Sequence, residues 1–442
     1  MTADIDTRLA NKILLGLLIG AVAGGVTLLA GEAFPDLLPA ARQFASVVLD
    51  PIGQVFLRML FFVVIPLVFA SLAMGVAQLE QLKDLGPLAT RTFILFFVNM
   101  SIAVALGLVM MNVVEPGSTM EPAARSSLLE EYGGDAAQHI QRRAAQPDMT
   151  TMTVVEMFMP RNLFGAFVGN SRDMLGDVLP LILFAILVGA AATRIEAEAR
   201  DRLRSGLSLI NDLMTGIVHF ALSIAPYAVP AMIYSVIVKI GWDIVVALGV
   251  FVVSCIFVML LHLFGTMSLW VKLLARRRLT EFWSQMRPVL VTAFSTSSSA
   301  ATLPTALTVA RQQMQVRAPV AGFVLPLGAT MNMAGTALYE GCVVLFVAQV
   351  FGIDLGLVQQ LTLLLLAVLS AVAVAAIPGG SLPLIAGLLA SFGLPPEGIG
   401  IILGVDRLLD MTRTMVNVSS DVVTATVVDR YTKADEAAAP AR

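Results

Sequence analysis

Long apolar stretches, separated by short polar connections, account for most of the chain. A helix needs about 17 to 25 predominantly apolar residues to cross a bilayer. Stretches of this kind cover residues 13–30, 44–78, 92–114, 177–193, 207–237, 243–271, 283–309, 319–351, 357–393 and 396–428. Several are longer than one crossing requires, so they must tilt, break or re-enter the membrane. The pattern predicts an all-α polytopic membrane protein.

The composition agrees with this prediction. Of the 442 residues, 57% are hydrophobic and 13% are charged, whereas soluble domains carry about 25% charged residues. The net charge of −3 gives no indication of a nucleic-acid partner, and we expect none. The two cysteines, Cys255 and Cys342, lie in apolar runs, so we expect no disulfide framework.

Basic residues gather in some connections and not in others, which predicts the orientation of the chain. The connections that we place in the cytoplasm contain Lys83, Arg91, Arg194, Arg200, Arg202, Arg204, Lys272, Arg276, Arg277, Arg278, Arg430 and Lys433. Both termini then lie inside the cell. The long polar connection 115–160 contains no spanning run, so we expect a solvated extracellular or periplasmic loop.

The last apolar stretch, residues 404–428, carries a strongly polar face. If the stretch is a helix, with about 100° per residue, several of its polar side chains fall within an arc of roughly 80°. These side chains are Asp406, Asp410, Arg413, Asn417 and Asp421. A charge at mid-bilayer costs about 3 kcal/mol or more, so such residues almost always face an interior site. The alternative is a salt-bridged helix on the surface of a soluble protein, which the membrane-like remainder of the chain disfavours.

Two other apolar stretches are interrupted. Residues 283–309 contain hydroxyl side chains from Ser295 to Ser299, and residues 357–393 contain a Pro-Gly-Gly sequence at 378–380. Each reads as two half-helices that meet at a non-helical tip, which membranes tolerate only beside a protein-enclosed or watery cavity. Small residues that allow close helix packing are the alternative. Two such tips together with a charged helix indicate the midplane site of a transporter.

The stretch between the two tips could hold a hard cation. An unwound segment there would expose carbonyl oxygens, which Na⁺ requires. Amide, hydroxyl and glycine residues interrupt the apolar run at Gly328, Thr330, Asn332, Gly335 and Thr336. Glu340 follows one turn later, and because its neutral form is cheap to bury it is a candidate for carrying a proton.

Taken together, these motifs resemble the dicarboxylate/amino acid:cation symporter family of prokaryotic and animal glutamate/aspartate transporters. The matching motifs, in chain order, are IPLVFASL (65–72), NLFGAF (162–167), SSSAATLP (297–304), GATMNMAGTALYEG (328–341), IPGGSLP (377–383) and LDMTRTMVNVSSD (409–421). The resemblance implies about eight transmembrane helices plus two re-entrant helical hairpins, arranged as inverted repeats. It also implies a homotrimer that works by an elevator movement.

The resemblance further implies a division into scaffold and transport domains. Scaffold helices 1 and 2 would occupy residues 1–78, and scaffold helices 4 and 5 residues 161–240. The transport domain would comprise helix 3 at 79–114 and residues 241–433, followed by a cytoplasmic tail at 434–442. Within residues 241–433, helix 6 would come first, then hairpin 1 at 283–309, helix 7 at 318–351, hairpin 2 at 357–393 and helix 8 at 396–428.

The substrate site implied by the resemblance lies between the two tips and the last helix. Arg413 would hold a side-chain carboxylate and Asp410 the amino group, and Thr414 and Asn417 would make further contacts. An amino-acid zwitterion with an extra carboxylate needs a cation and an anion close together, which this helix supplies. The complete implied set is Ser298, Ser299, Met333, Thr336, Pro378, Gly379, Asp410, Arg413, Thr414 and Asn417.

The resemblance also implies two Na⁺ sites. The first would use Asp421 with backbone oxygens of Gly328, Asn332 and Asn417, and the second Thr330, Met333, Ala371, Val372 and Val374. A third site of the family is altered, because Ala334 replaces its aspartate and its helix-3 partners correspond to Phe96, Asn99 and Met100. Glu340 stands where animal members carry a proton-coupling glutamate, and Arg407 resembles the proton-coupled bacterial branch.

The main hypothesis is therefore a bacterial inner-membrane symporter that imports L-aspartate or L-glutamate with Na⁺, H⁺ or both, without a cofactor. A C4-dicarboxylate carrier is the close alternative, which Asp410 disfavours because it would lack a partner. An anion channel would not need a charged pocket between two tips. A hydrolase with Ser297, Ser298 or Ser299 as nucleophile lacks a nearby histidine or lysine base, so we expect no enzyme.

Overall fold

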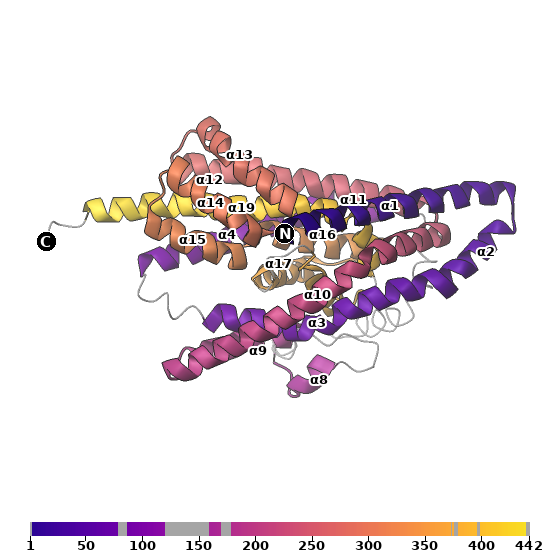
Figure 1. The fold of residues 1–442 in the computed structure, drawn as a ribbon, viewed down its shortest axis with the longest axis horizontal. Helices are drawn as coiled ribbons and strands as arrows, with labels where there is room; N and C mark the ends of the chain where they lie inside the picture. The colour runs from indigo at the N-terminus through magenta and orange to yellow at the C-terminus, as the bar shows by residue number, and fades with distance from the viewer. Residues whose placement is uncertain are drawn as a thin grey trace.

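The computed structural model describes residues 2–77, 86–119, 159–168, 178–372, 374, 379–395 and 398–438, and their secondary structure is helical (Figure 1). Four stretches of these residues are long and apolar enough to cross a membrane. They are Leu37–Met74, Pro87–Thr119, Trp242–Leu273 and Ala318–Val350. A bent pair, Ala197–Ala221 and Ser223–Lys239, adds a fifth if it counts as one span. These findings confirm the all-α membrane class, whereas the count of eight crossings stays a prediction.

The elements follow the predicted apolar stretches closely. In chain order they are α1 (Thr2–Ala33), α2 (Leu37–Phe44), η1 (Ala45–Leu49), α3 (Asp50–Ala77), α4 (Pro87–Val114), η3 (Pro116–Thr119), α8 (Leu163–Val168), α9 (Val178–Ala192), α10 (Ala197–Ile240), α11 (Trp242–Leu261), η4 (His262–Thr266), α12 (Met267–Leu273), α13 (Leu279–Thr296), α14 (Ser299–Thr308), η5 (Val309–Gln313), α15 (Ala318–Met331), α16 (Ala334–Val350), α17 (Leu357–Ala371), α18 (Leu382–Ser391) and α19 (Ile399–Ala438). Most of the predicted loop 115–160 lies outside the described residues.

The first group of helices is arranged around the long helix α10. Helices α1 and α3 lie against α10, and α9 lies against α3 (Figure 1). Helix α10 bends by 50° after Ala221. Pro226 explains the bend, because a proline lacks the N–H that would bond to the preceding turn and its ring clashes there. Lys239 of α10 pairs with Asp50 at the start of α3, with 2.6 Å between Nζ and Oδ2.

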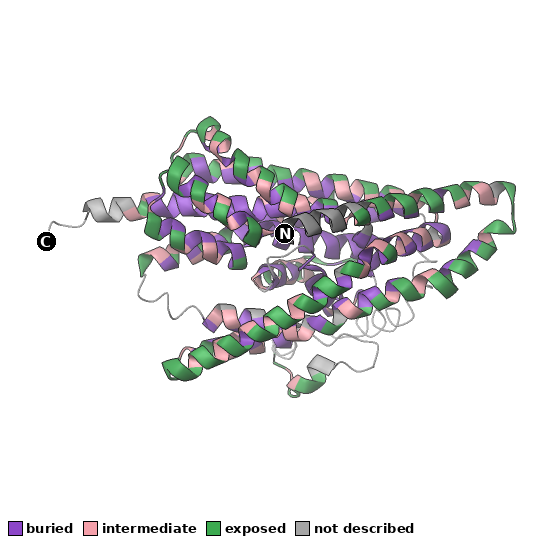
Figure 2. Cartoon of the chain, in the orientation of Figure 1, coloured by how far each residue is buried: buried purple, intermediate pink, exposed green. Residues whose placement is uncertain are grey.

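A second group surrounds α16 and α19. Helix α16 packs against α4, α17 and α19, and α19 also packs against α13 and α15. In the most apolar part of Ala318–Val350, 94% of the residues are buried, whereas 39% are buried in the corresponding part of Trp242–Leu273. Helices α15 and α16 are therefore enclosed by protein, and Figure 2 shows the same contrast between the buried α16 and α19 and the exposed sides of α1, α10 and α13.

Both interrupted stretches are broken helices, as predicted. Helices α13 and α14 meet at residues 297 and 298 and run antiparallel, because Gln285 near the start of α13 donates to the carbonyl of Gln313 beyond α14, at 3.2 Å. Helices α17 and α18 are separated by residues 372–381 and pack against each other. Whether either pair re-enters the membrane from one side stays a prediction.

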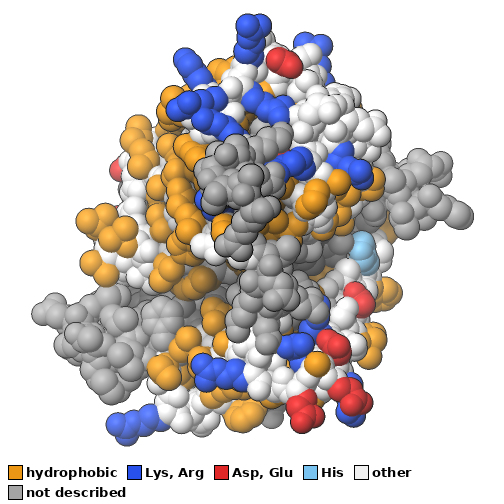
Figure 3. Space-filling model, turned by 90° about the vertical axis from the view of Figure 1, so that its left-hand side faces the viewer, with side chains coloured by type: hydrophobic (Ala, Val, Ile, Leu, Met, Phe, Trp, Pro, Cys, Tyr) orange, Lys and Arg blue, Asp and Glu red, His pale blue; other side chains and the backbone are white. Residues whose placement is uncertain are grey.

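The basic connections lie at one end of the protein. The α9–α10 and α12–α13 connections and the C-terminal end of α19 lie together at the left of Figure 1. Figure 3 views this end and shows lysine and arginine side chains gathered on it. The α1–α2 connection lies at the opposite end of the long axis. This separation is the charge asymmetry on which the predicted orientation depends.

Candidate functional site

The polar face predicted for the last helix is buried in the structure. Asp406 is 6% exposed, Asp410 2%, Arg413 3%, Asn417 4% and Asp421 2%. All five lie on α19, whose opposite side includes the partly exposed Leu408. The helix therefore directs its charges toward neighbouring helices, as its periodicity predicts.

Asp410 and Arg413 form an ion pair within the protein. Arg413 Nη2 lies 2.7 Å from Asp410 Oδ1, and Nε donates to the same oxygen at 2.9 Å. Arg407 adds a second positive charge, with Nη1 at 3.7 Å from Asp410 Oδ2. Because the pair is buried, each charge depends on its partner, and removing either would leave an uncompensated charge. Thr414, one turn beyond Asp410, donates its hydroxyl to the Asp410 carbonyl at 2.8 Å.

Asp406 and Tyr339 support the other side of Arg413. The Tyr339 hydroxyl donates to Asp406 Oδ1 at 2.9 Å, and Arg413 Nη1 lies 3.8 Å from the same oxygen. The Arg413 guanidinium also lies 5.1 Å from the centroid of the Tyr339 ring, within the range of a cation–π contact. These contacts hold the guanidinium in one orientation.

The second tip contacts the same charges. Gly379 N donates to Asp410 Oδ2 at 3.2 Å, and Arg413 Nη1 donates to Ser381 Oγ at 2.5 Å. Gly379 has a φ of 71°, a conformation that a side chain would strain. The broken helix thus delivers one N–H and one hydroxyl to the ion pair. Pro378, predicted beside Gly379, lies outside the described residues.

The first tip is built from three serines. Ser297 ends α13 in a left-handed conformation, with φ 49°, and is 2% exposed. Ser298 is the N-cap residue before α14, and its Oγ accepts the backbone N–H of Ala301 at 3.2 Å. Ser299 is 4% exposed. Helices α13 and α14 both pack against α19. Among the described residues, Ser299 forms no hydrogen bond with the Asp410–Arg413 pair.

The break between α15 and α16 lies at Asn332 and Met333, as the sequence predicts. Asn417 of α19 caps the new helix, because its Oδ1 accepts the N–H groups of Gly335 at 2.8 Å and Thr336 at 3.2 Å. Its Nδ2 donates to Thr336 Oγ1 at 3.1 Å. The predicted residues Thr336 and Asn417 are therefore brought together and satisfy each other.

Asp421 lies against the other side of the same break. Asn332 Nδ2 donates to Asp421 Oδ1 at 2.8 Å. A Cβ on Gly328 would clash with Asp421 Oδ1, so glycine is required for the close approach. Among the described residues Asp421 forms no ion pair, and Asn332 Oδ1 and Asn99 Oδ1 are buried without a partner. A buried carboxylate with nearby amide oxygens is a donor set that suits a hard monovalent cation.

Ser420 connects this cluster to α4. Asn332 Nδ2 donates to Ser420 Oγ at 2.8 Å, and Asn99 Nδ2 of α4 forms a second hydrogen bond to the same oxygen. Asn99 is flanked on the buried face of α4 by Phe96 and Met100. Of the three helix-3 positions named from the sequence, Asn99 thus reaches the residues at the break, and it is the one among them whose side chain offers oxygen.

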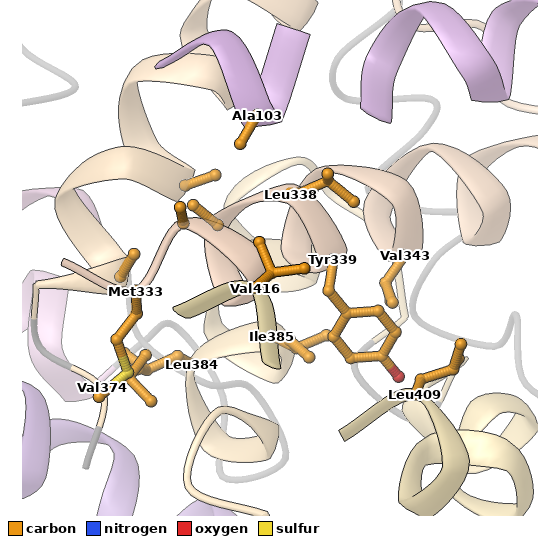
Figure 4. Close-up of a cluster of buried hydrophobic side chains, with 14 of the residues drawn as sticks. Ala103, Met333, Leu338, Tyr339, Val343, Val374, Leu384, Ile385, Leu409 and Val416 are labelled. Atoms are coloured by element: carbon orange, nitrogen blue, oxygen red, sulfur yellow. The ribbon is translucent and has the colours of Figure 1, made fainter. Parts of the chain in front are cut away.

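The residues predicted for the second Na⁺ site are only partly brought together. Figure 4 shows the Met333 thioether beside Val374 and Leu384. Ala371 is fully buried at the end of α17, and Val372 is the C-cap residue that follows it. Thr330 is exposed, and its hydroxyl donates to the Leu327 carbonyl at 3.0 Å.

Glu340 is completely buried in the second turn of α16. Its Oε2 accepts the Ser370 hydroxyl of α17 at 2.8 Å, and no described residue contacts its Oε1 by a hydrogen bond. The described part of the chain also contains no group of three or more His, Cys, Asp or Glu side chains that could hold a metal ion.

Several side chains that form hydrogen bonds in or near the site could not be assigned a partner from the sequence. These residue types are common in helices of membrane proteins, and nothing in the neighbouring sequence indicates which other helix they contact. The residues are Asn99, Tyr339, Ser370, Ser381 and Ser420, of which only Asn99 was named, as a departure from the family pattern. The SLP sequence after the second tip was the only available hint for Ser381.

A helical membrane protein with two broken helices around a buried, charge-paired site belongs to the class of secondary transporters. A sequence model of the Sodium:dicarboxylate symporter family matches residues 9–431. The chain therefore belongs to this family, which confirms the resemblance drawn from its motifs. Membership of a transporter family also agrees with the expectation that the protein is not an enzyme.

Three curated relatives illustrate the similarity. The chain is 30% identical over 434 residues to the "Proton/sodium-glutamate symport protein" of Bacillus subtilis (strain 168), covering 97% of this chain and 93% of the relative. It is 27% identical over 436 residues to the "Proton/glutamate-aspartate symporter" of Escherichia coli (strain K12), covering 97% and 94%. It is 29% identical over 415 residues to human "Excitatory amino acid transporter 3", covering 86% and 79%.

Proposed function

We propose that the protein is a secondary active symporter that imports L-aspartate or L-glutamate, driven by a Na⁺ gradient, an H⁺ gradient or both. The observation that carries the proposal is the buried contact between Asp410 and Arg413, which the second tip covers through Gly379 and Ser381. The names of the relatives, which are glutamate or glutamate-aspartate symporters, support the same substrate class.

An acidic amino acid can replace this ion pair without leaving a charge unpaired. Its amino group would pair with Asp410 and its side-chain carboxylate would pair with Arg413. The ion pair between Asp410 and Arg413 is then replaced by two ion pairs with the substrate. The planar guanidinium of Arg413 can bind a carboxylate through two parallel hydrogen bonds, which favours an acidic over a neutral side chain. Tyr339 and Asp406 would keep the guanidinium oriented during this exchange.

The Asp421 cluster supports coupling to a cation. A carboxylate that is 2% exposed and forms no described ion pair is costly to bury unless a cation or a proton neutralises it. The close approach of Gly328 and the hydrogen bond from Asn332 support the first proposed Na⁺ site, to which Asn417, one turn earlier on α19, would contribute its backbone oxygen. The second proposed Na⁺ site, around Met333 and Val374, would form where the break faces the second tip.

Ala334 motivates the proposal that the third sodium site is altered. Its side chain is completely buried directly after the break, so the position that would carry a carboxylate in the family pattern offers no ligand. Asn99 supplies a neutral oxygen nearby, without the negative charge that a cation would need for compensation.

The proposal is tested by uptake of labelled aspartate and glutamate into proteoliposomes under imposed Na⁺ or pH gradients. We expect saturable uptake that requires at least one gradient and that stops in the Asp410→Asn and Arg413→Gln variants. Uptake that ignores both gradients would refute the coupling, and a unitary conductance without accumulation would instead indicate a channel.

A C4-dicarboxylate symporter is the second candidate, and one observation favours it. Arg407 lies 3.7 Å from Asp410 Oδ2, so Asp410 could keep a positive partner while Arg413 binds a substrate that has no amino group. Succinate, malate and fumarate as competitors of aspartate uptake distinguish the two. Strong competition by succinate would favour the dicarboxylate carrier, and none would favour the amino-acid carrier.

The proposed elevator mechanism has support in how the helices pack. Helix α10 packs against α1 and α3, and α3 packs against α9, whereas α4, α11 and α13–α19 pack mainly within their own group, with smaller contacts between the two groups. This grouping fits the proposed scaffold (1–78 and 161–240) and transport domain (79–114 and 241–433). A homotrimer in the bacterial inner membrane, with both termini in the cytoplasm, is part of the same proposal. Mass measurement in detergent and accessibility labelling of single cysteines at residues 195 and 35 would test it.

A further inference from the structure

Glu340 and Ser370 form a contact whose role goes beyond the substrate and cation sites. Glu340 is 0% exposed on α16, and Ser370 is 1% exposed in the last turn of α17. The Ser370 hydroxyl donates to Glu340 Oε2 at 2.8 Å. Glu340 Oε1 is buried and forms no hydrogen bond with the described residues. A completely buried carboxyl group thus depends on a single hydroxyl.

The surrounding helices supply little compensation for a negative charge on Glu340. The buried faces of α4, α17 and α18 present amides and hydroxyls but no charged side chain among the described residues. Helix α11 presents Cys255, and Tyr339 lies beside Glu340 on α16. Helix α19 presents the remaining buried titratable and charged groups, which are Asp406, Arg407, Asp410, Arg413, Asp421 and Asp429.

Among these groups, Arg413 carries the positive charge that would attract a negative charge on Glu340. Arg413 is already paired with Asp410 and Asp406, however, and forms no ion pair with Glu340 in the described structure. Burying an ionised carboxylate without a close cation costs several kcal/mol, whereas burying a neutral acid with a hydrogen bond costs far less. The environment therefore suits a carboxyl group that holds a proton.

A hydroxyl is well suited to accompany such a proton. Ser370 can donate to an ionised or neutral carboxyl oxygen, and it can accept from a protonated one. It can therefore remain bonded to Glu340 Oε2 in both protonation states. An alanine at this position would leave Glu340 with no partner on either oxygen, in a site that is closed to water.

Ser370 also connects Glu340 to the tip that covers the substrate site. It lies one residue before the end of α17, and the chain continues to Gly379 and Ser381, which bond to Asp410 and Arg413. The second broken helix is thus attached to α16 by Ser370 and to α19 by its tip. A change at Glu340 that moves the end of α17 would therefore also move Gly379 and Ser381, which cover the Asp410–Arg413 pair.

We propose that Ser370 is a positioning residue for Glu340, holding its carboxyl group so that a proton can be bound and released while α17 stays attached to α16. The inference rests on the proposed function for its transport readout, and on the geometry of Glu340 and Ser370 alone for its spectroscopic one.

The experiment compares Ser370→Ala, Ser370→Thr and Thr362→Val in the full-length protein. Thr362→Val is the matched control, because Thr362 lies on the same helix, is partly exposed and donates its hydroxyl to the Val358 carbonyl of its own helix. In proteoliposomes we expect Ser370→Ala to displace the pH dependence of aspartate uptake by about one pH unit toward higher pH, because a hydrogen bond to an ionised carboxylate is stronger than one to the neutral acid. Ser370→Thr, which keeps the hydroxyl, and Thr362→Val should retain the wild-type profile.

Infrared spectroscopy supplies a readout that does not need transport. The carbonyl stretch of protonated Glu340 is identified by its loss in Glu340→Gln, and it should move to higher frequency in Ser370→Ala because a hydrogen bond is lost. Glu340→Gln/Ser370→Ala should have the same pH profile of uptake as Glu340→Gln alone. Monodispersity and thermal unfolding confirm that each variant is folded.

An unchanged infrared band and an unchanged pH profile in folded Ser370→Ala would overturn the inference, as would an equal effect of Thr362→Val. Failure of the wild type to transport aspartate or glutamate would overturn the proposed function instead. In that case the infrared comparison would still decide whether Ser370 positions the Glu340 carboxyl group.

Discussion

Asp421 gives the sharpest test of how this protein binds a cation. Its carboxylate is 2% exposed, receives one described side-chain hydrogen bond, from Asn332, and forms no described ion pair. Replacing it by asparagine preserves its shape and removes its charge. We expect the Asp421→Asn variant to fold and to lose the stabilisation that Na⁺ gives the wild-type protein.

The magnitude follows from the charge that is removed. Two unit charges 4 Å apart interact by about 4 kcal/mol at an effective dielectric constant of 20. Part of this is offset by removing water from the cation. We therefore expect Na⁺ affinity to fall about 100-fold, which corresponds to about 2.7 kcal/mol. In the wild type, Na⁺ at 100 times its dissociation constant should stabilise the folded state by about the same amount.

The assay is thermal unfolding in NaCl and in choline chloride at equal ionic strength. For the wild type we expect Na⁺ to raise the Tm by about 5 °C, and for Asp421→Asn by less than about 1 °C. Asp429→Asn is the matched control, because Asp429 is equally buried on α19 but is paired with Arg317 at 2.9 Å. It should lower the Tm similarly in both salts and keep the Na⁺ increment.

Two results would refute this reasoning. If Asp421→Asn keeps the full Na⁺ increment, the cation binds elsewhere. If Asp429→Asn loses the increment as well, the effect reflects general damage to α19 and not a charge beside a cation.

Three further predictions concern other charged or small residues. Arg413→Lys should lower kcat/KM for aspartate uptake by about 10- to 100-fold, because a lysine cannot reproduce the several charge-assisted hydrogen bonds of the guanidinium; initial rates of uptake measure this. Lys239→Met should destabilise the fold by about 1 to 2 kcal/mol, because Asp50 is 27% exposed and its loss of a partner is partly offset by water; thermal unfolding measures this. Ala334→Asp should steepen the Na⁺ dependence of uptake, because a fully buried carboxylate needs a cation; uptake at varied Na⁺ concentration measures this.

Each of these has its own counter-result. Unchanged uptake by Arg413→Lys would exclude a bidentate carboxylate contact. The Lys239→Met/Asp50→Asn double variant should recover part of the lost stability, and a strictly additive loss would mean that the 2.6 Å pair contributes no coupling. A folded Ala334→Asp protein with an unaltered Na⁺ dependence would show that this position does not face a cation.

The sequence by itself determined the helices and the polar face of α19. Apolar runs of sufficient length have few ways to bury their backbone in a membrane, so α4, α11 and α15–α16 follow the predicted stretches. The 100° periodicity places Asp406, Asp410 and Arg413 on one face without reference to any other segment. The breaks at Ser297 and at Asn332–Met333 were also predictable, because hydroxyl-rich or glycine-rich interruptions of an apolar run weaken a helix locally.

Only the tertiary structure decided which amide and hydroxyl groups meet across helices. Asn99 bonds to Ser420 from a position 321 residues away, and Ser370 meets Glu340 across 30 residues. Serine and asparagine are common in membrane helices, and nothing local distinguishes one that bonds its own turn from one that faces another helix. Helix packing brings Ser381 to Arg413 and Asn417 to the start of α16. Local periodicity within α19 therefore sets both the charges of the site and the pairing of Asp410 with Arg413. The amide and hydroxyl groups that bond to these charges depend on which helices lie side by side.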